Sequence, residues 1–306
     1  MAKELVFGHQ NPDTDAIAAA IAASYYLNQK GMDTEAVALG KTNDETNFVL
    51  DYFSVEAPRV IEKADTKEVV LVDHNETAQS VSNIEDLTVT HVFDHHKIDF
   101  KTSSPLFYHA EALGSTSTIL YGFFKKDGIE IPKKIAGLML SGLISDTLLL
   151  KSPTTTDVDR DVIGKLASIA GVDDVNAYGL NLLKAGTNLS KKSEQDLIDG
   201  DAKTFKFAGK TFRIGQVNTV DIPSVLERKE ALKKAIIAEN EKQGFDGFLF
   251  VITDILNSNS KALYYGSEPD KIASAFNGKF VDDSIDLPGV VSRKKQIVPP
   301  LTDLFH

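Results

Sequence analysis

Short apolar segments alternate with helical segments through the first half of the chain. Residues 5–7, 37–39, 69–72 and 89–93 are runs rich in Val, Leu and Phe, which we interpret as strands. Strands that are apolar along their whole length are typical of parallel sheets, which are buried on both faces. Helices are expected at 16–29, 46–53, 117–124, 133–144 and 157–169. The alternation predicts an α/β domain with helices on both faces of a parallel sheet.

The second half of the chain has a different pattern. A polar, Gly-containing stretch ends near residue 193, and residues 204–207 and 211–217 then flank Ala208-Gly209 as a β-hairpin. A long helix is expected at 221–242, with Asp221 as its N-cap, and strands at 248–252 and 261–265. We therefore predict two domains. The first domain is expected at residues 1–188. The second, at 194–306, is expected to be a smaller α/β domain with a mixed sheet, and residues 189–193 would form the linker between them.

Composition excludes several classes of function. The 306 residues carry 44 acidic and 33 basic side chains, so the net charge of −11 disfavours nucleic-acid and membrane partners. There is no cysteine, which excludes disulfides, thiolate metal sites and a thiol nucleophile. The N-terminal residues 1–9 lack an apolar signal segment, and the longest apolar stretch, 138–150, is too short to cross a bilayer. We expect a cytoplasmic protein.

Three polar clusters each follow a predicted strand. Ligands of open parallel sheets bind beyond the carboxyl ends of the strands, so these clusters are expected to meet. Asp146, which follows an apolar helical stretch, could close the same site. Five of the seven histidines lie in or beside the clusters. The clusters are His9-Gln10-Asn11-Pro12-Asp13-Thr14-Asp15, Asp73-His74-Asn75 and Asp94-His95-His96.

The residue types of these clusters point to metal chemistry. Carboxylates combined with imidazoles, without thiolates, suit Mn²⁺, Co²⁺ or Fe²⁺ better than Mg²⁺ or Ca²⁺ alone. Carboxylates can also bridge two metal ions, and such pairs catalyse in-line displacement at phosphorus. Each feature has a simpler interpretation when taken singly: Asp13 or Asp15 could cap the helix that follows, and Asp146 could be a satisfied buried polar group. Their coincidence favours one shared site.

Two further segments could bind phosphate. Ser292-Arg293-Lys294-Lys295-Gln296 places three consecutive cations between apolar, Pro-containing segments, and Arg and Lys are the usual phosphate ligands. A solvated surface is the simpler interpretation of this charge run. The segment 112–118 precedes a helix, and its Ser and Thr residues could cap that helix or leave its N-terminus free for a phosphate.

The ordered set of motifs resembles the DHH phosphoesterase superfamily, and the basic segment is similar to that of family II, manganese-dependent inorganic pyrophosphatases. The resemblance extends from His9 to Pro300. It implies hydrolysis of pyrophosphate to two phosphates by a metal-bridging hydroxide at a two-Mn²⁺ centre in a DHH domain. Co²⁺ or Mg²⁺ would be able to substitute, and an additional Mg²⁺ would arrive with the substrate. It also implies a homodimer formed through the N-terminal domain and an active site between the two domains.

The resemblance assigns a role to each site residue. One metal ion would be bound by His9, Asp13, Asp73 and Asp146, and the other by Asp15, Asp73, His95 and Asp146. Asp73 and Asp146 would bridge the two ions. Asp13, Asp15 and His96 would be the catalytic residues. The substrate would be bound by His96, Lys203, Arg293 and Lys294.

Two rival functions are compatible with the same motifs. A DHH-type exopolyphosphatase or oligonucleotide phosphodiesterase would use the same metal centre, but nuclease relatives typically carry a glycine-rich, His-containing motif in the C-terminal domain. This chain has scattered glycines there instead. A non-enzymatic metal- or phosphate-binding protein would be expected to have lost ligands, whereas all of the expected ligands are present.

Overall fold

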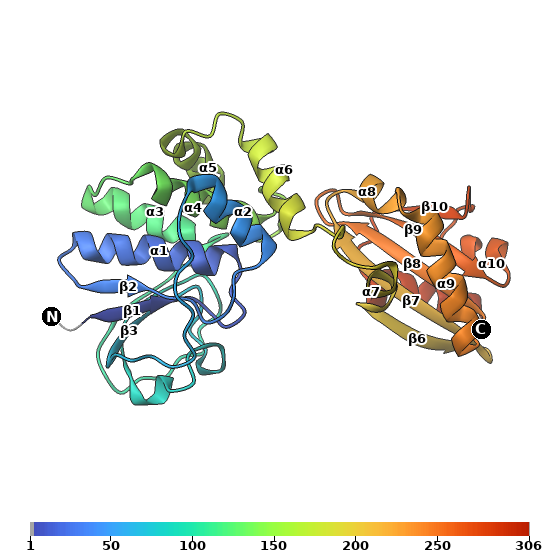
Figure 1. Ribbon diagram of the computed structural model, residues 1–306, viewed down its shortest axis with the longest axis horizontal. Coiled ribbons are helices and arrows are strands. Elements are labelled where there is room, and N and C mark those ends of the chain that lie inside the picture. Colours follow the sequence, from blue (N-terminus) through green and yellow to red (C-terminus); the bar gives the residue numbers. More distant parts are fainter. Residues whose placement is uncertain (1–2, 306) are drawn as a thin grey trace. The chain divides into compact units, whose positions relative to one another are not determined.

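The computed structural model describes residues 3–305. Met1 and Ala2, which belong to the N-terminal segment inspected for a signal, and His306 lie outside the described residues. The chain divides into two compact units, Met1–Gly186 and Thr187–His306 (Figure 1). Residues 187–193, where the second unit begins, contain neither helix nor strand. No helix in the described part of the chain is long and apolar enough to cross a membrane.

The first unit is built on a five-stranded sheet in which every pair of neighbours is parallel. The strand order β2-β1-β3-β4-β5 places β1 and β3 inside the sheet, and their apolar residues are almost completely buried. This confirms the parallel α/β sheet that the continuous apolar runs predicted. The strands are β1 (Glu4–Phe7), β2 (Thr34–Ala36), β3 (Glu68–Val72), β4 (Thr88–Asp94) and β5 (Phe107–Ala110).

Two layers of helices cover one face of this sheet. The α1 helix lies against the strands, and α4 packs on it in a further layer (Figure 1). Close approach is possible because α1 is rich in buried alanine and Gly142 of α4 lies against Asp15 of α1. The other face is covered by loops and the short 3₁₀ helices Thr77–Gln79 and Ile84–Asp86. The predicted parallel sheet is thus present, but α-helices cover one of its faces and not both, because the segments after β3 and before β5 are too short and irregular to form α-helices. The α-helices are α1 (Thr14–Gln29), α2 (Asp44–Phe53), α3 (Thr116–Asp127), α4 (Lys133–Thr147), α5 (Asp157–Ala170) and α6 (Val175–Gly186).

The second strand lies earlier than the apolar pattern predicted. We predicted a strand at 37–39, but β2 is Thr34–Ala36, and within 37–39 only Ala38 forms an isolated bridge, to Val60. The prediction is wrong because the pairing with β1 ends at Ala36, and the chain then turns to exchange hydrogen bonds with residues 59 and 61 through Ala38. Val37 is nevertheless buried, in the cluster beneath the sheet.

The second unit contains a mixed sheet of order β10-β9-β8-β7-β6, in which β7 and β8 are parallel and the other pairs are antiparallel. Alternate residues of β8 face opposite sides of this sheet. Phe248, Phe250 and Ile252 pack with α7, α8 and α9, whereas Leu249 and Val251 pack with α10 and α11. The strands are β6 (Ala202–Phe207), β7 (Lys210–Thr219), β8 (Gly247–Asp254), β9 (Asn259–Gly266) and β10 (Ser284–Pro288).

The helix expected at 221–242 is two helices, so the prediction of a single helix is wrong. Asp221 caps α8 as expected, accepting a hydrogen bond from the Ser224 amide at 3.3 Å. The chain breaks at Arg228, whose guanidinium bonds the Glu194 carboxylate at 2.7 Å and the Lys192 carbonyl at 2.7 Å. The helices of this unit are α7 (Glu194–Asp199), α8 (Ile222–Leu226), α9 (Lys229–Gln243), α10 (Pro269–Ser274) and α11 (Val298–Leu304).

Two glycine substitutions test the packing of the helix layers. A Cβ at Gly137 of α4 would collide with the ring of Phe53 of α2, so Gly137→Ala should lower the free energy of unfolding by about 1–2 kcal/mol. The matched control is Gly164→Ala in α5, where a Cβ meets nothing within 4 Å. Helix propensity predicts that this control gains about 0.5–1 kcal/mol. Urea unfolding of the metal-free protein measures both, and equal shifts would contradict the packing described.

Candidate metal centre

The predicted clusters meet at the carboxyl edge of the parallel sheet. Asp73 directly follows β3, and His95 and His96 directly follow β4. His9 lies two residues beyond β1. Asp13 and Asp15 begin α1, where Asp13 is the N-cap and accepts a hydrogen bond from the Ala16 amide at 2.9 Å. Asp146 comes from elsewhere in the sequence and lies in the last turn of α4.

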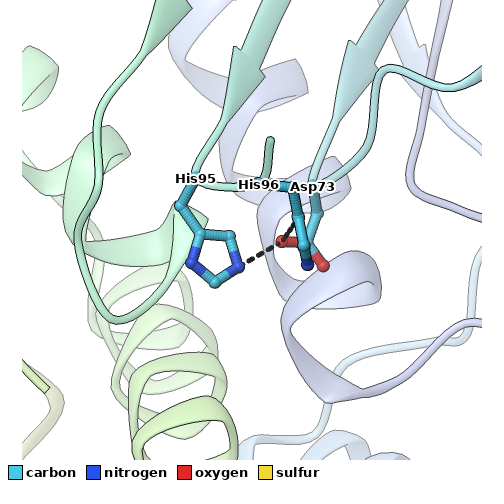
Figure 2. Close-up of side chains that lie close together, drawn as sticks. All are labelled: Asp73, His95 and His96. Atoms are coloured by element: carbon cyan, nitrogen blue, oxygen red, sulfur yellow. Dashed lines mark ion pairs between the residues drawn. The ribbon is translucent and has the colours of Figure 1, made fainter. Parts of the chain in front are cut away.

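Asp73 lies at the centre of this cluster. Its carboxylate is 3.6 Å from His9 Nε2, 3.3 Å from His95 Nε2 and 4.0 Å from His96 Nδ1. Figure 2 shows both neighbouring imidazoles, His95 and His96, beside the Asp73 carboxylate. Asp73 adopts φ of 58°, in the left-handed region, so the backbone turns sharply as β3 ends.

Asp73 belongs to three groups of side chains whose potential ligand atoms all lie within 4.8 Å of one another. Among the described residues, Asp146 belongs to only one of these groups, where its carboxylate is 3.3 Å from His95 Nε2. The three groups are His9-Asp13-Asp73, Asp15-Asp73-His95-Asp146 and Asp73-His95-His96.

Two of the histidines are oriented as metal ligands usually are. The Nδ1 of His9 is 2.9 Å from the Gln10 carbonyl, and the Nδ1 of His95 is 3.0 Å from the Leu113 carbonyl. Donation from Nδ1 to a carbonyl leaves Nε2 as the atom with a free lone pair. The Nε2 of His95 and the Oδ2 of Asp73 are buried without a hydrogen-bond partner. Buried polar atoms are normally paired, so these atoms fit a bound cation.

The N-terminus of α3 is engaged by carboxylates of the protein itself. Asp15, fully buried, accepts hydrogen bonds from the Thr116 amide at 2.7 Å and from the Ser117 amide at 3.2 Å. The Thr116 hydroxyl donates to Asp73 at 2.9 Å. Ser115 is the N-cap, accepting from the Thr118 amide at 3.1 Å. The capping interpretation of residues 112–118 is therefore the one that the structure shows.

Crowded carboxylates dominate the electrostatics of the cluster. Burial, together with the charge of Asp73, raises the pKa of Asp15 to about 8. Burial and the charge of Asp15 raise the pKa of Asp146 well above its usual range. Burial disfavours the charged imidazoles, but the neighbouring carboxylates outweigh it and raise the pKa of His9 to about 9 and that of His95 to about 12. Without a metal ion, this cluster therefore holds protons in place of cations.

His96 is held by Asp94 rather than by Asp73. The fully buried Asp94 carboxylate is 2.9 Å from His96 Nδ1 and also accepts from the His96 amide at 3.1 Å. Asn75 donates to the other oxygen of Asp94 at 2.5 Å. The hydrogen bond with Asp94 raises the pKa of His96. About half of the His96 side chain is exposed, on a cavity of about 510 Å³ that Asp13, His95 and Asp146 also line.

The remaining histidines of the sequence clusters lie outside the three groups. His74 is buried beside Phe7, with Nδ1 2.9 Å from the Val72 carbonyl, and burial lowers its pKa. His91 lies within β4, between Phe93 and Phe107, and burial lowers its pKa as well. Closeness to the motifs in the sequence therefore does not place these two imidazoles among the potential ligands.

The basic segment of the second unit lines a cavity of about 470 Å³ together with Lys203, Gln216 and Asn218. It forms a π-helical turn, Arg293–Ile297, a conformation that is frequent at functional sites. The Arg293 guanidinium bonds the Asp201 carboxylate at 2.6 Å. Lys203 and Lys294 are exposed, and their ammonium groups have no ion-pair partner among residues 3–305.

Backbone contacts fix the turn that carries these cations. The Gln296 side chain accepts from the amides of Val291 and Ser292, both at 3.0 Å, and donates to the Gly289 carbonyl at 2.8 Å. Gln216 of β7 donates to the Val291 carbonyl at 3.0 Å. The segment is therefore an ordered turn with two exposed lysines, and not only a solvated charge run.

Sequence reasoning missed Asp159, which supports the cluster from α5. This fully buried carboxylate accepts from the Gly114 amide at 2.9 Å and from the hydroxyls of Thr118 and Thr156, each at 2.7 Å. It thereby fixes the loop whose Leu113 carbonyl orients His95. The spacing of Thr156 and Asp159 is the signature of a capping box, but no local pattern signals the contact with Gly114, 45 residues away.

The chain matches known protein families and solved structures over nearly its whole length. Residues 3–143 match the model of the DHH family N-terminal domain, and residues 180–304 match that of the DHHA2 domain. A crystal structure of a Methanococcus jannaschii protein assigned to family II of the inorganic pyrophosphatases is similar, with a TM-score of 0.64 and 40% identity over 99% of each chain. An exopolyphosphatase-related protein from Bacteroides fragilis shares the fold, at 14% identity and a TM-score of 0.53 over 99% of this chain and 91% of that one.

Curated relatives match over their full length. A probable manganese-dependent inorganic pyrophosphatase of Lactiplantibacillus plantarum is 58% identical over 309 aligned positions, covering 100% of both chains. The protein of the same description from Enterococcus faecalis is 53% identical, again over 100% of both. Together with the ordered motifs and the Asp/His cluster, these matches show that the chain belongs to family II, the manganese-dependent inorganic pyrophosphatases of the DHH superfamily.

Proposed function

We propose that the protein hydrolyses inorganic pyrophosphate to two phosphates at a manganese centre. The observation that carries the proposal is the set of carboxylate and imidazole groups that share Asp73 and leave buried ligand atoms unpartnered. Relatives that match the whole chain are described by the same activity and the same metal.

We propose two Mn²⁺ ions per subunit, with Asp73 as a shared ligand. His9 and Asp13 would complete one site, and Asp15, His95 and Asp146 the other. Asp146 is also expected to reach the first ion, although its carboxylate does not belong to the His9-Asp13-Asp73 group. When bound, the ions supply positive charge and lower the pKa of a water ligand toward neutrality. Co²⁺ or Mg²⁺ would substitute, and an additional Mg²⁺ would accompany pyrophosphate.

Residues of the chain itself bind and orient the substrate. His96 is fixed through Nδ1 by Asp94, and the same hydrogen bond raises the pKa of His96 and so favours its imidazolium form. The Nε2–H of that form would donate a hydrogen bond to a phosphoryl oxygen. Asp13 and Asp15 act by holding the ions, because Asp15 is locked by amides of α3 and Asp13 by the N-terminus of α1. Such fixed groups need little reorganisation as charge develops on the phosphoryl oxygens.

The cations of the second unit would bind the phosphate groups. Lys203 and Lys294 are exposed ammonium groups that line one cavity, and Arg293 is held beside them by Asp201. Pyrophosphate carries several negative charges, which bound metal ions neutralise only in part. We propose that these three side chains balance the remainder.

We also propose a homodimer formed through the first unit. β5 is the last strand in its sheet, so its outer edge is unpaired within that sheet. Phe107 of this strand is 41% exposed and contacts Phe123 edge-to-face, and both rings line two grooves of about 380 and 260 Å³. An exposed, aromatic edge strand is a surface that a second copy can cover.

The first prediction concerns the reaction. Protein stripped of metal and reloaded with Mn²⁺ should release phosphate from pyrophosphate in strong preference to polyphosphate, ATP or a dinucleotide. Asp73→Asn should lose Mn²⁺ and at least about 100-fold in kcat, because it removes the shared ligand. Asp173→Asn, an exposed position, is the control. Preferred turnover of polyphosphate or a dinucleotide would favour the rival functions, and Mn²⁺ binding without any turnover would favour a binding protein.

The second prediction concerns pH. The pKa values of Asp15 and His9 are raised to about 8 and about 9, so the folded protein holds protons that the unfolded chain releases. The thermal midpoint of the metal-free protein should therefore fall as pH rises from about 7 to about 9. Added Mn²⁺ displaces these protons, so its stabilising shift should grow over the same range. Scanning calorimetry with and without Mn²⁺ measures both, and Asp15→Asn should flatten the metal-free profile. A metal-free profile that rises with pH would contradict the cluster.

The third prediction concerns the dimer. Phe107→Glu places a charge on the β5 edge and should convert the dimer to a monomer in sedimentation velocity experiments. Val158→Glu, at a 45% exposed position in the first turn of α5, is the matched control and should remain dimeric. If Phe107→Glu is also dimeric, the subunits associate through another surface.

A further inference from the structure

We infer that Glu45 is a positioning residue of the metal centre, which fixes the ligands of α1 relative to the ligand of α4. Glu45 lies in the first turn of α2 and belongs to none of the three ligand groups. The inference rests on the proposed metal centre, because it assigns a residue that supports that same site.

One oxygen of Glu45 joins the two ligand-bearing helices. Its Oε1 accepts a hydrogen bond from the Thr14 hydroxyl at 2.7 Å and another from the Ser145 hydroxyl at 2.5 Å. Thr14 stands between Asp13 and Asp15 in the sequence, and Ser145 directly precedes Asp146. The Thr46 hydroxyl, 3.2 Å from that of Thr14, extends the network along α2. A single acceptor atom therefore fixes the backbone beside three expected ligands.

The other oxygen of Glu45 faces the end of α6. A Cβ built at Gly186, the last residue of that helix, would collide with Glu45 Oε2 and lie 3.0 Å from the Glu45 Cβ. Three helices, α1, α4 and α6, therefore meet this side chain of α2. Burial raises the pKa of Glu45, with a further contribution from the charge of Asp13. A carboxylate so enclosed is costly unless its contacts organise neighbouring groups.

Metal sites are sensitive to such supporting contacts. Ligands must be held to within about half an ångström of the productive geometry, and loss of an outer partner typically lowers metal affinity or activity by about 10- to 100-fold. Asp146 gains most from this support, since it lies at the end of α4, where the chain leaves the helix. The bond to Ser145 links the last turn of α4 to Glu45, and the bond to Thr14 links Glu45 to α1.

The test compares Mn²⁺ affinity in three variants of the full chain. Glu45→Ala should weaken Mn²⁺ binding about 10- to 100-fold, with kcat largely restored at saturating Mn²⁺, because the ligands themselves remain. Glu45→Gln keeps an oxygen at the Oε1 position and should bind Mn²⁺ within about threefold of the wild type. Asp51→Asn, an exposed carboxylate on the same helix, is the control and should bind as the wild type does. Titration of folded, metal-stripped protein by electron paramagnetic resonance provides the constants.

A second pair of variants covers the case in which Glu45→Ala does not fold. Ser145→Ala removes one of the two hydrogen bonds and should weaken Mn²⁺ binding in the same direction. Gly186→Ala should weaken Mn²⁺ binding, because the new methyl group would displace the Glu45 side chain. The loss of affinity caused by Gly186→Ala should be smaller in a Glu45→Gly background, where that side chain is absent.

The outcomes separate the inference from the proposed function. Wild-type affinity in Glu45→Ala, beside normal Mn²⁺-dependent pyrophosphate hydrolysis, would overturn the inference and leave the function intact. Loss of affinity in Glu45→Gln equal to that in Glu45→Ala would also overturn it, since the charge and not the hydrogen bonds would then be responsible. If the wild-type protein binds no Mn²⁺, it is the proposed function that fails.

Discussion

The crowding of buried carboxylates at the carboxyl edge of the parallel sheet is the constraint on which the first unit depends. Asp15 and Asp73 are almost fully buried, and Asp146 adds a third carboxyl group beside them. Removing an ionised carboxylate from water costs several kcal/mol unless charge or hydrogen bonds compensate. The protein compensates in part with the amides of α3 and the imidazoles of His9 and His95. Divalent cations would supply the charge that is still missing, and they would convert a destabilising cluster into a binding site.

Three carboxylates outside the metal-binding cluster fix the positions of the proposed ligands and of His96. Asp94 holds His96, and Asp159 fixes the loop whose carbonyl orients His95. Glu45 bonds the hydroxyls beside the ligands of α1 and α4. Among the described residues, none of these three side chains belongs to a group of potential ligand atoms. The division between binding and supporting carboxylates therefore follows from where each one lies relative to the other ligands, and not from residue type, because Asp15 also accepts several hydrogen bonds.

The parts of the fold predicted from sequence are those with strong local patterns. β1, β3 and β4 were predictable because strands buried on both faces require uninterrupted apolar residues. β5 was not, because an edge strand such as Phe107–Ala110 is only half buried and carries no such run. The break at Arg228 was also beyond prediction, since its guanidinium binds groups that lie more than 30 residues earlier in the chain. Asp159 was missed for the same reason, because its neighbours in the sequence indicate only that it caps a helix.

The sequence by itself determined the fold class, and it predicted that the polar clusters share one site, because polar motifs that follow parallel strands meet where those strands end. The family, and the residues proposed to bind metal and substrate, were inferred from the resemblance of the ordered motifs to a known family. Only the tertiary structure decided how those residues are held. It showed that amides at the N-terminus of α3 donate hydrogen bonds to Asp15, that Asp94 orients His96 and that Glu45 lies between α1 and α4. These are contacts between residues distant in the chain. Their geometry depends on how whole helices pack, and no local pattern of residues records that.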